Sequence, residues 1–265
     1  MDRPGARKRV LDMGKLVAVA GKGGTGKSTI AALLIRWLVE KGQGPILAVD
    51  ADPNYTLGQL LGIKVEKTIG SLREQFMKES ALIPPGLSRS SLLESQFHAA
   101  VHEGRGVDLL VMGRQEGPGC YCAINSLLRD FLKTVSENYP YVVVDNEAGM
   151  EHLSRANTAR IDLLLIVAEH SLNAARAALR IKQLVEELEL EVARSLLVLN
   201  KAPQLPASEV MAELERTGLD ILAVLPHSPA LYELDAAGRP LAELDRADPV
   251  VSKLSLGLEQ TLNIR

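Results

Sequence analysis

A glycine-rich turn between an apolar run and a helical stretch is the feature that most constrains how this chain can fold. Residues 16–19 are apolar and rich in β-branched side chains, which predicts a buried strand. The sequence GKGGTGKS follows at residues 21–28 and fits the phosphate-binding pattern G-x-x-x-x-G-K-S/T. A helix is predicted from residue 29 to about residue 41. Strand, turn and helix in this order indicate a nucleotide-binding loop in an α/β fold, rather than a plain connection.

The residue types of this loop match the chemistry of a bound phosphate. Glycines let the backbone bring its N–H groups up to phosphate oxygens, and the positive end of the following helix points to the same place. Lys27 is predicted to hold the β- and γ-phosphates, and the hydroxyl of Ser28 to bind Mg²⁺. The predicted nucleotide ligands of the loop are Gly21, Gly23, Gly24, Thr25, Gly26, Lys27, Ser28 and Thr29.

Strand and helix patterns alternate along the rest of the chain, which is typical of a parallel sheet covered by helices. Helical patterns include residues 69–77, 90–101 and 172–188. Further strands are predicted at residues 46–49, 107–112, 141–144, 163–167, 196–199 and 221–225. We therefore expect a doubly wound, mostly parallel α/β sheet of about seven strands. The expected organisation is one domain at residues 15–265 after a disordered tail at residues 1–14.

Charge and hydropathy limit the partners that this chain can have. The formal net charge of −3 argues against nucleic acid as the main partner, because no domain-wide basic field is present. No apolar run is long enough to span a membrane, and the basic start lacks the apolar region of a signal peptide. The C-terminal helix has one apolar face and few cations, so we expect it to pack onto the body instead of a membrane. A cytoplasmic location follows as the expectation.

Polar residues that directly follow predicted strands are candidates for the rest of the site. Asp145 ends a buried strand, where proteins with this loop carry a carboxylate that helps to hold Mg²⁺. Asn200 and Lys201 end another strand. A guanine-reading site needs an aspartate two residues after that lysine, whereas this chain has Pro203. Asn200 can both donate to and accept from the edge of adenine, so ATP is favoured over GTP.

The two cysteines of the chain, Cys120 and Cys122, are separated by one residue. A disulfide between them would close a strained ring in a reducing compartment. A metal site, a redox pair and coincidence remain as explanations. Two thiolates are too few for a tetrahedral metal site, but two from each half of a dimer would supply four. Paired cysteines from two subunits could therefore complete one metal site, and all three explanations stay open at this point.

The loop sequence KGGTGKST, with its second lysine Lys22, resembles the deviant Walker A motif of the family that includes MinD, ParA and the nitrogenase iron protein. The resemblance implies that Lys22 reaches across a dimer to the partner's nucleotide. It implies that Asp50 supports the hydrated Mg²⁺ and that Asp52 orients the attacking water, so the catalytic residues are Lys22, Lys27 and Asp52. It also places Pro226 near the adenine base. The sequence DNEAG at residues 145–149 resembles switch II, with glutamate where proline is usual.

The combination of KGGTGKST, DADPN, GCYC, DNEAGMEHLSR and LNK resembles the CooC family over nearly the whole chain. These are accessory ATPases that insert nickel into carbon monoxide dehydrogenase, with relatives that serve acetyl-CoA synthase. The resemblance implies a homodimer that hydrolyses ATP with Mg²⁺. It also implies that Cys120 and Cys122 of both subunits share Ni²⁺ or Zn²⁺, which is delivered to such a client enzyme. A MinD/ParA-type positioning ATPase without metal and an iron–sulfur reductase gated by ATP are the alternatives.

Overall fold

Parallel strands form the centre of the molecule. The computed structural model describes residues 14–79, 95–113, 134–135, 137–147, 160–203 and 207–262, and within these ranges one sheet holds eight strands in the order β3-β4-β2-β5-β1-β6-β7-β8. Every pairing is parallel except that between β3 and β4. The strands are β1 (Lys15–Gly21), β2 (Ile46–Asp50), β3 (Val101–Glu103), β4 (Val107–Val111), β5 (Tyr141–Asp145), β6 (Leu163–Glu169), β7 (Ser195–Asn200) and β8 (Asp220–Val224).

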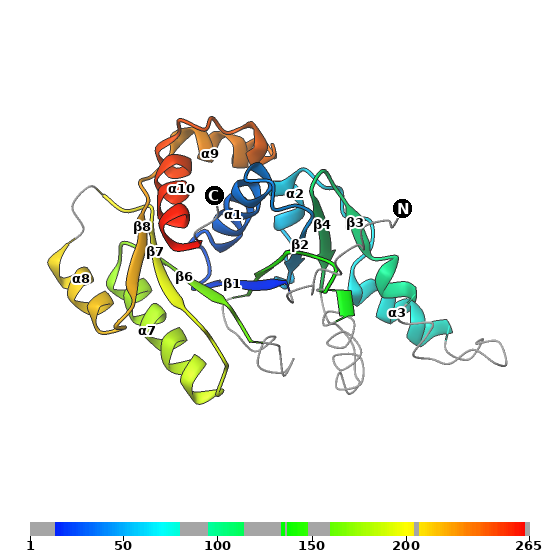
Figure 1. Ribbon diagram of the computed structural model, residues 1–265, viewed down its shortest axis with the longest axis horizontal. Helices are drawn as coiled ribbons and strands as arrows, with labels where there is room; N and C mark the ends of the chain where they lie inside the picture. Colours follow the sequence, from blue (N-terminus) through cyan, green and yellow to red (C-terminus); the bar gives the residue numbers. More distant parts are fainter. Residues whose placement is uncertain are drawn as a thin grey trace, which may run out of the picture.

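Helices cover both faces of this sheet (Figure 1). One face carries α1 (Lys27–Glu40), α2 (Leu57–Leu61), α9 (Pro229–Ala236), the 3₁₀ turn η2 (Leu241–Glu243) and α10 (Pro249–Leu262). The other carries α3 (Ile69–Glu79), α7 (Leu172–Glu187) and α8 (Ser208–Glu215). The predicted doubly wound α/β architecture is confirmed.

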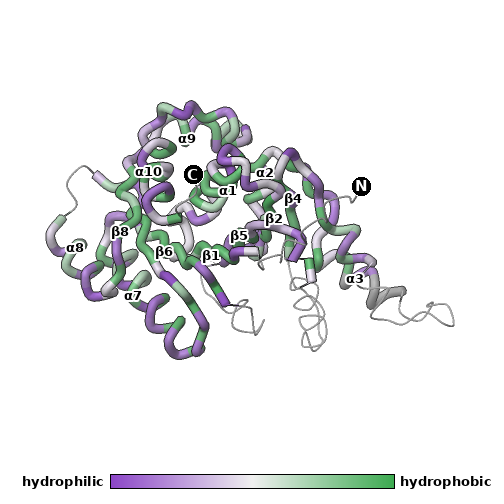
Figure 2. The backbone as a smooth tube through the Cα atoms, in the orientation of Figure 1, coloured by the Kyte–Doolittle hydropathy of each residue, from purple (hydrophilic) through white to green (hydrophobic). Residues whose placement is uncertain are grey.

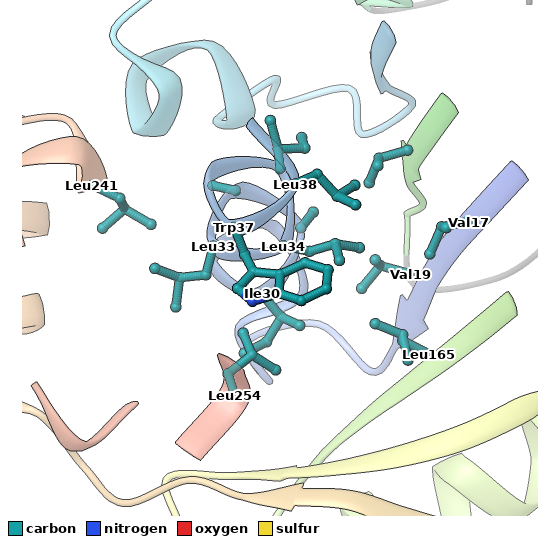
Figure 3. Packing of buried hydrophobic residues seen from close by; sticks show 14 of the residues in the cluster. Val17, Val19, Ile30, Leu33, Leu34, Trp37, Leu38, Leu165, Leu241 and Leu254 are labelled. Atoms are coloured by element: carbon teal, nitrogen blue, oxygen red, sulfur yellow. The ribbon is translucent and has the colours of Figure 1, made fainter. Parts of the chain in front are cut away.

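Alternation along the central strands divides the core into two layers. Val17 and Val19 of β1 belong to the cluster beneath α1 and α10, whereas Ala18 and Ala20 belong to the cluster beneath α7. The central strands are strongly apolar, as expected for a sheet that is buried on both faces (Figure 2). Figure 3 shows how α1 is held: Trp37 lies among Leu33, Leu34 and Leu254, between β1 and α10.

The edge of the sheet next to β4 differs from the prediction. A helical pattern was expected over residues 90–101, but only residues 95–98 are helical among those described there, and Val101–Glu103 forms the antiparallel strand β3. This strand raises the count from about seven to eight. Its short length explains the error, because three residues are too few to display a period of two.

The C-terminal helix packs against the body of the protein, as predicted. In α10, Val251, Leu254 and Leu258 are buried, and Leu262 packs against the same core cluster. None of the described helices combines the length and apolar content that a membrane-spanning helix requires.

Candidate nucleotide-binding site

The loop between β1 and α1 lies at the edge where the parallel strands end. Its glycines are needed for its shape: Gly24 and Gly26 have φ angles of +84° and +91°, which favour glycine. Gly21 packs so closely on β6 that a Cβ there would overlap the carbonyl oxygen of Val167. The predicted phosphate loop therefore requires glycine at positions 24 and 26 for their backbone conformation, and at position 21 because no side chain fits there.

Carbonyl groups of this loop are hydrogen-bonded within the free protein. Thr25 donates through its backbone N–H and its hydroxyl to the carbonyl of Lys22, at 3.3 and 2.8 Å. The Asn200 amide donates to the carbonyl of Thr25 at 2.8 Å, and Lys201 Nζ donates to that of Gly24 at 3.0 Å. Because the C=O and N–H of a trans peptide point in opposite directions, the bond to the Thr25 carbonyl turns the Gly26 N–H away from Asn200.

The start of α1 is suited to an anion. Its first turn has no acidic residue, and no described side chain caps it, whereas α7 and α9 are capped by Ser171 and Ser228. The backbone N–H groups at this end therefore need another acceptor. A phosphate at the loop would supply one and would interact favourably with the helix dipole.

Two carboxylates occupy the opposite flank of the loop, at the ends of neighbouring strands. Asp50 of β2 and Asp145 of β5 are register partners, and both are fully buried. Asp50 accepts backbone hydrogen bonds from Asp52 at 3.1 Å and from Leu57 at 3.0 Å. Burial raises the pKa of Asp50 to about 6, and these two bonds act in the opposite direction.

Asp145 is the carboxylate that most needs a further partner. Neither of its buried oxygens accepts a hydrogen bond. Burial raises its pKa to about 7 and the charge of Asp50 acts in the same direction, while the nearby Ser28 hydroxyl and the charge of Lys27 lower it. A buried carboxylate without a partner, next to a hydroxyl, is the donor set that Mg²⁺ prefers. The described residues therefore fit the predicted Mg²⁺ site, which Ser28, Asp50 and Asp145 would hold directly or through water.

Of the three predicted catalytic residues, Lys22 and Asp52 are more accessible than Lys27. Lys22 is exposed on the loop, and Lys27 is buried. Asp52 is half-buried, and its Oδ1 accepts hydrogen bonds from the backbone and side chain of Asn54 at 2.8 and 3.0 Å. These contacts fix the turn that carries Asp52. Two roles remain predictions: that Asp52 orients the attacking water, and that Lys22 reaches the nucleotide of the partner subunit.

The base side of the loop is formed by the ends of β6, β7 and β8. Asn200 is buried, Lys201 is exposed, and Pro226 is half-buried directly after Leu225, whose carbonyl accepts from the Ala202 N–H at 2.9 Å. The structure thus brings Asn200 and Lys201 onto the phosphate loop itself. The predicted contacts of Asn200 and Pro226 with adenine, and the prediction that Lys201 helps to bind the nucleotide, are not tested by these contacts.

The family model for the CobQ/CobB/MinD/ParA nucleotide-binding domain (CbiA) matches residues 16–241. The chain belongs to the CobQ/CobB/MinD/ParA family. The family is described as a nucleotide-binding domain, and the matched residues include the whole glycine-rich loop at residues 21–28.

Relatives cover nearly the whole chain. An uncharacterized ATP-binding protein of Methanocaldococcus jannaschii is 38% identical over 252 residues, 94% of this chain and 98% of its own length. The carbon monoxide dehydrogenase accessory protein CooC of Rhodospirillum rubrum is 30% identical over 244 residues, 87% of this chain and 90% of that protein. A chain of the MinC:MinD cell division protein complex of Aquifex aeolicus matches with a TM-score of 0.68 at 20% identity, covering 94% of this chain and 96% of that one, which shows the fold.

Two residues of this family member were not predicted. Glu169 ends β6 and pairs with Lys201 at 2.7 Å. Asn146 is fully buried and donates to the carbonyls of Val19 and Val144 at 3.0 and 3.4 Å. Both are polar residues at the end of an apolar strand, which is the signal that identified Asp145 and Asn200.

The predicted metal-binding cysteines, Cys120 and Cys122, lie outside the described residues, as does nearly all of the predicted N-terminal tail. Within the part of the chain that the structure describes, no group of three or more histidine, cysteine, aspartate or glutamate residues could hold a metal ion.

Proposed function

We propose that this protein is an ATPase that dimerises around ATP and uses hydrolysis to deliver a metal ion to a client enzyme. The observation that carries the ATPase is the unpartnered, buried carboxylate of Asp145 beside Ser28, at the end of a phosphate loop. Isolated buried charge is unfavourable, so such a group is retained where a bound cation compensates it.

Each residue of the site has a distinct role in this proposal. Ser28, Asp50 and Asp145 hold Mg²⁺ directly or through water, and the ion neutralises charge that develops on the phosphates. Lys27 binds the β- and γ-phosphates, and Asp52 orients water for attack on the γ-phosphorus. Lys22 adds positive charge to the transition state from the partner subunit.

Adenine recognition belongs to Asn200 and Pro226 in the same proposal. The Asn200 amide donates a hydrogen bond to the phosphate loop, so this side chain would contact the loop and the adenine base together. Its carbonyl oxygen and N–H group suit the donor and acceptor of the adenine edge.

Metal delivery rests on Cys120 and Cys122. Two pairs of thiolates that face each other across a two-fold axis would give Ni²⁺ or Zn²⁺ four soft ligands. The relative CooC supports carbon monoxide dehydrogenase or a similar enzyme, such as acetyl-CoA synthase, as the client. ATP and metal would favour the same closed dimer, so each should tighten binding of the other by one common factor.

The runner-up is a positioning ATPase without a metal cargo. The carboxysome distribution protein A of Gloeothece citriformis is 30% identical over 182 residues, 67% of this chain and 65% of that protein. This function requires the same nucleotide site but not the cysteines.

Metal titration combined with sedimentation distinguishes the two. We expect one Ni²⁺ or Zn²⁺ per dimer in the wild type, and loss of that ion in the Cys120→Ala/Cys122→Ala variant while ATP hydrolysis survives. Metal bound once per monomer, or bound equally by the variant, would contradict metal delivery. In the same assay, Asp52→Ala should bind ATP but lose turnover, since only the water-orienting group is removed.

A further inference from the structure

A chain of polar contacts connects the end of β6 to the phosphate loop through Lys201. The Lys201 ammonium donates to Glu169 Oε1 at 2.7 Å and to the carbonyl of Gly24 at 3.0 Å. Glu169 and Asn200 are register neighbours on β6 and β7, so Lys201 directly follows the strand beside Glu169. We call Glu169, Lys201 and the Gly24 carbonyl the loop clamp.

The backbone of Lys201 is shaped for this contact. Its φ angle of +51° lies in the left-handed region, which is uncommon for a residue with a side chain. The next residue, Ala202, donates its N–H to Leu225 and so ties this turn to the chain after β8. Such a backbone conformation is unfavourable unless its surroundings hold it, and it often occurs at functional sites.

The clamp acts on the part of the loop that carries Lys22. The peptide whose carbonyl Lys201 holds donates its N–H, from Thr25, to the Lys22 carbonyl at 3.3 Å. The Thr25 hydroxyl closes the same turn at 2.8 Å. The turn over residues 22–25 is thus held from outside through Gly24. Asn200 instead holds the next peptide, whose N–H belongs to Gly26.

We propose that Glu169 and Lys201 are positioning residues that orient the Lys22 turn of the phosphate loop for ATP hydrolysis, rather than ligands of the nucleotide. The proposal rests on the ATPase activity proposed above. A stabilising role explains the clamp less well, because both side chains are partly exposed, at 47% and 37%, and exposed ion pairs contribute little to stability.

The decisive experiment separates binding from turnover. Lys201→Met and Glu169→Gln remove one charge each and keep similar side-chain size. Lys182→Met removes one charge from the Lys182–Glu186 pair on α7 and is the matched control. For each protein, the dissociation constants of ATP and ADP and the single-turnover hydrolysis rate are measured, also with Lys22→Ala added.

We expect Lys201→Met to lower the hydrolysis rate about tenfold and Glu169→Gln to lower it less, with both dissociation constants within about twofold of wild type. Combined with Lys22→Ala, Lys201→Met should have almost no further effect, because both changes remove the same oriented group. In the nucleotide-free protein, amide hydrogen exchange of residues 22–26 should be faster in Lys201→Met than in Lys182→Met.

Weaker binding of ATP and ADP at an unchanged rate would make Lys201 a nucleotide ligand and overturn the proposal. Rates equal to those of Lys182→Met, or effects that add to Lys22→Ala, would overturn it as well. If wild type and Lys182→Met both fail to hydrolyse ATP, the proposed ATPase fails instead. The hydrogen-exchange comparison then decides the clamp by itself: faster exchange supports it and equal exchange refutes it.

Discussion

The two flanks of the phosphate loop differ in how far the free protein satisfies its own polar groups. On the base side, Asn200 and Lys201 bind carbonyls of the loop, and Glu169 neutralises the lysine. On the metal side, Asp145 has two buried oxygens without a hydrogen bond, and burial raises its pKa to about 7. The polar groups of one flank are thus hydrogen-bonded to other groups of the protein, whereas the Asp145 carboxylate of the other flank is not.

The contrast assigns different roles to the two flanks: the base side fixes the conformation of the loop, and the metal side binds a cation. Groups on the base side stabilise one conformation of the loop, so little reorganisation is needed when phosphate binds. The metal side keeps a buried carboxylate that is unfavourable by itself and becomes favourable beside a cation. Variants of the two flanks should therefore respond differently to Mg²⁺, pH and nucleotide.

Lys27→Ala should give the largest effect, because this residue lies between the two flanks and carries the main positive charge for the phosphates. We expect ATP affinity to fall by about 3 kcal/mol or more, about a hundredfold. Isothermal titration against the Lys182→Met control measures it. Equal ATP affinity in wild type and Lys27→Ala would remove the loop from the nucleotide site.

Asp145→Asn should stabilise the nucleotide-free protein at high pH. Because burial raises the pKa of Asp145 from 3.8 to about 7, the folded state binds more protons than the unfolded state between these values. The free energy of unfolding therefore falls as pH rises through this window. Asparagine cannot ionise, so at pH 8 the variant should be more stable than wild type by about 2–4 kcal/mol, and the gain should vanish near pH 4.

Urea unfolding without Mg²⁺ at pH 4 and pH 8 measures this difference. Asp235→Asn, an exposed change of the same kind on α9, should alter stability by less than about 0.5 kcal/mol at either pH. If Asp145→Asn is less stable than wild type at pH 8, the ionised Asp145 carboxylate has favourable partners within the protein, which would contradict the prediction.

Asn200→Ala should have a smaller effect, on binding. We expect ATP affinity to fall by about 1–3 kcal/mol, since the Thr25 carbonyl and the base edge both lose a partner. Inorganic triphosphate, which has no base, should lose less, and GTP binding should not improve. Equal losses for ATP and triphosphate would show that Asn200 acts only through the loop.

The order of strands and helices could be predicted because buried parallel strands are apolar runs with polar residues at their ends. The same signal pointed to Asp145 and Asn200, whereas Asp50, the register partner of Asp145, came from the family resemblance. It could not say what each side chain contacts: Asn200 and Lys201 were predicted from base chemistry, but in the free protein they bind the phosphate loop. Such contacts depend on the order of the strands in the sheet, here β1-β6-β7, which the pattern of any single strand does not specify.

The strand β3 was missed by the prediction for a related reason. Three residues paired to β4 show no period of their own, and the first of them, Val101, was taken as the end of the helix predicted at residues 90–101. Glu169 was missed although it follows an apolar strand, because its role depends on Lys201 from another strand.

The most direct test of the difference between the flanks is ATP titration with and without Mg²⁺ on wild type, Asp145→Asn and Asn200→Ala. We predict that Mg²⁺ tightens ATP binding in wild type and by a similar factor in Asn200→Ala, but hardly at all in Asp145→Asn. The same Mg²⁺ enhancement in Asp145→Asn as in wild type would contradict the assignment of Asp145 to the metal.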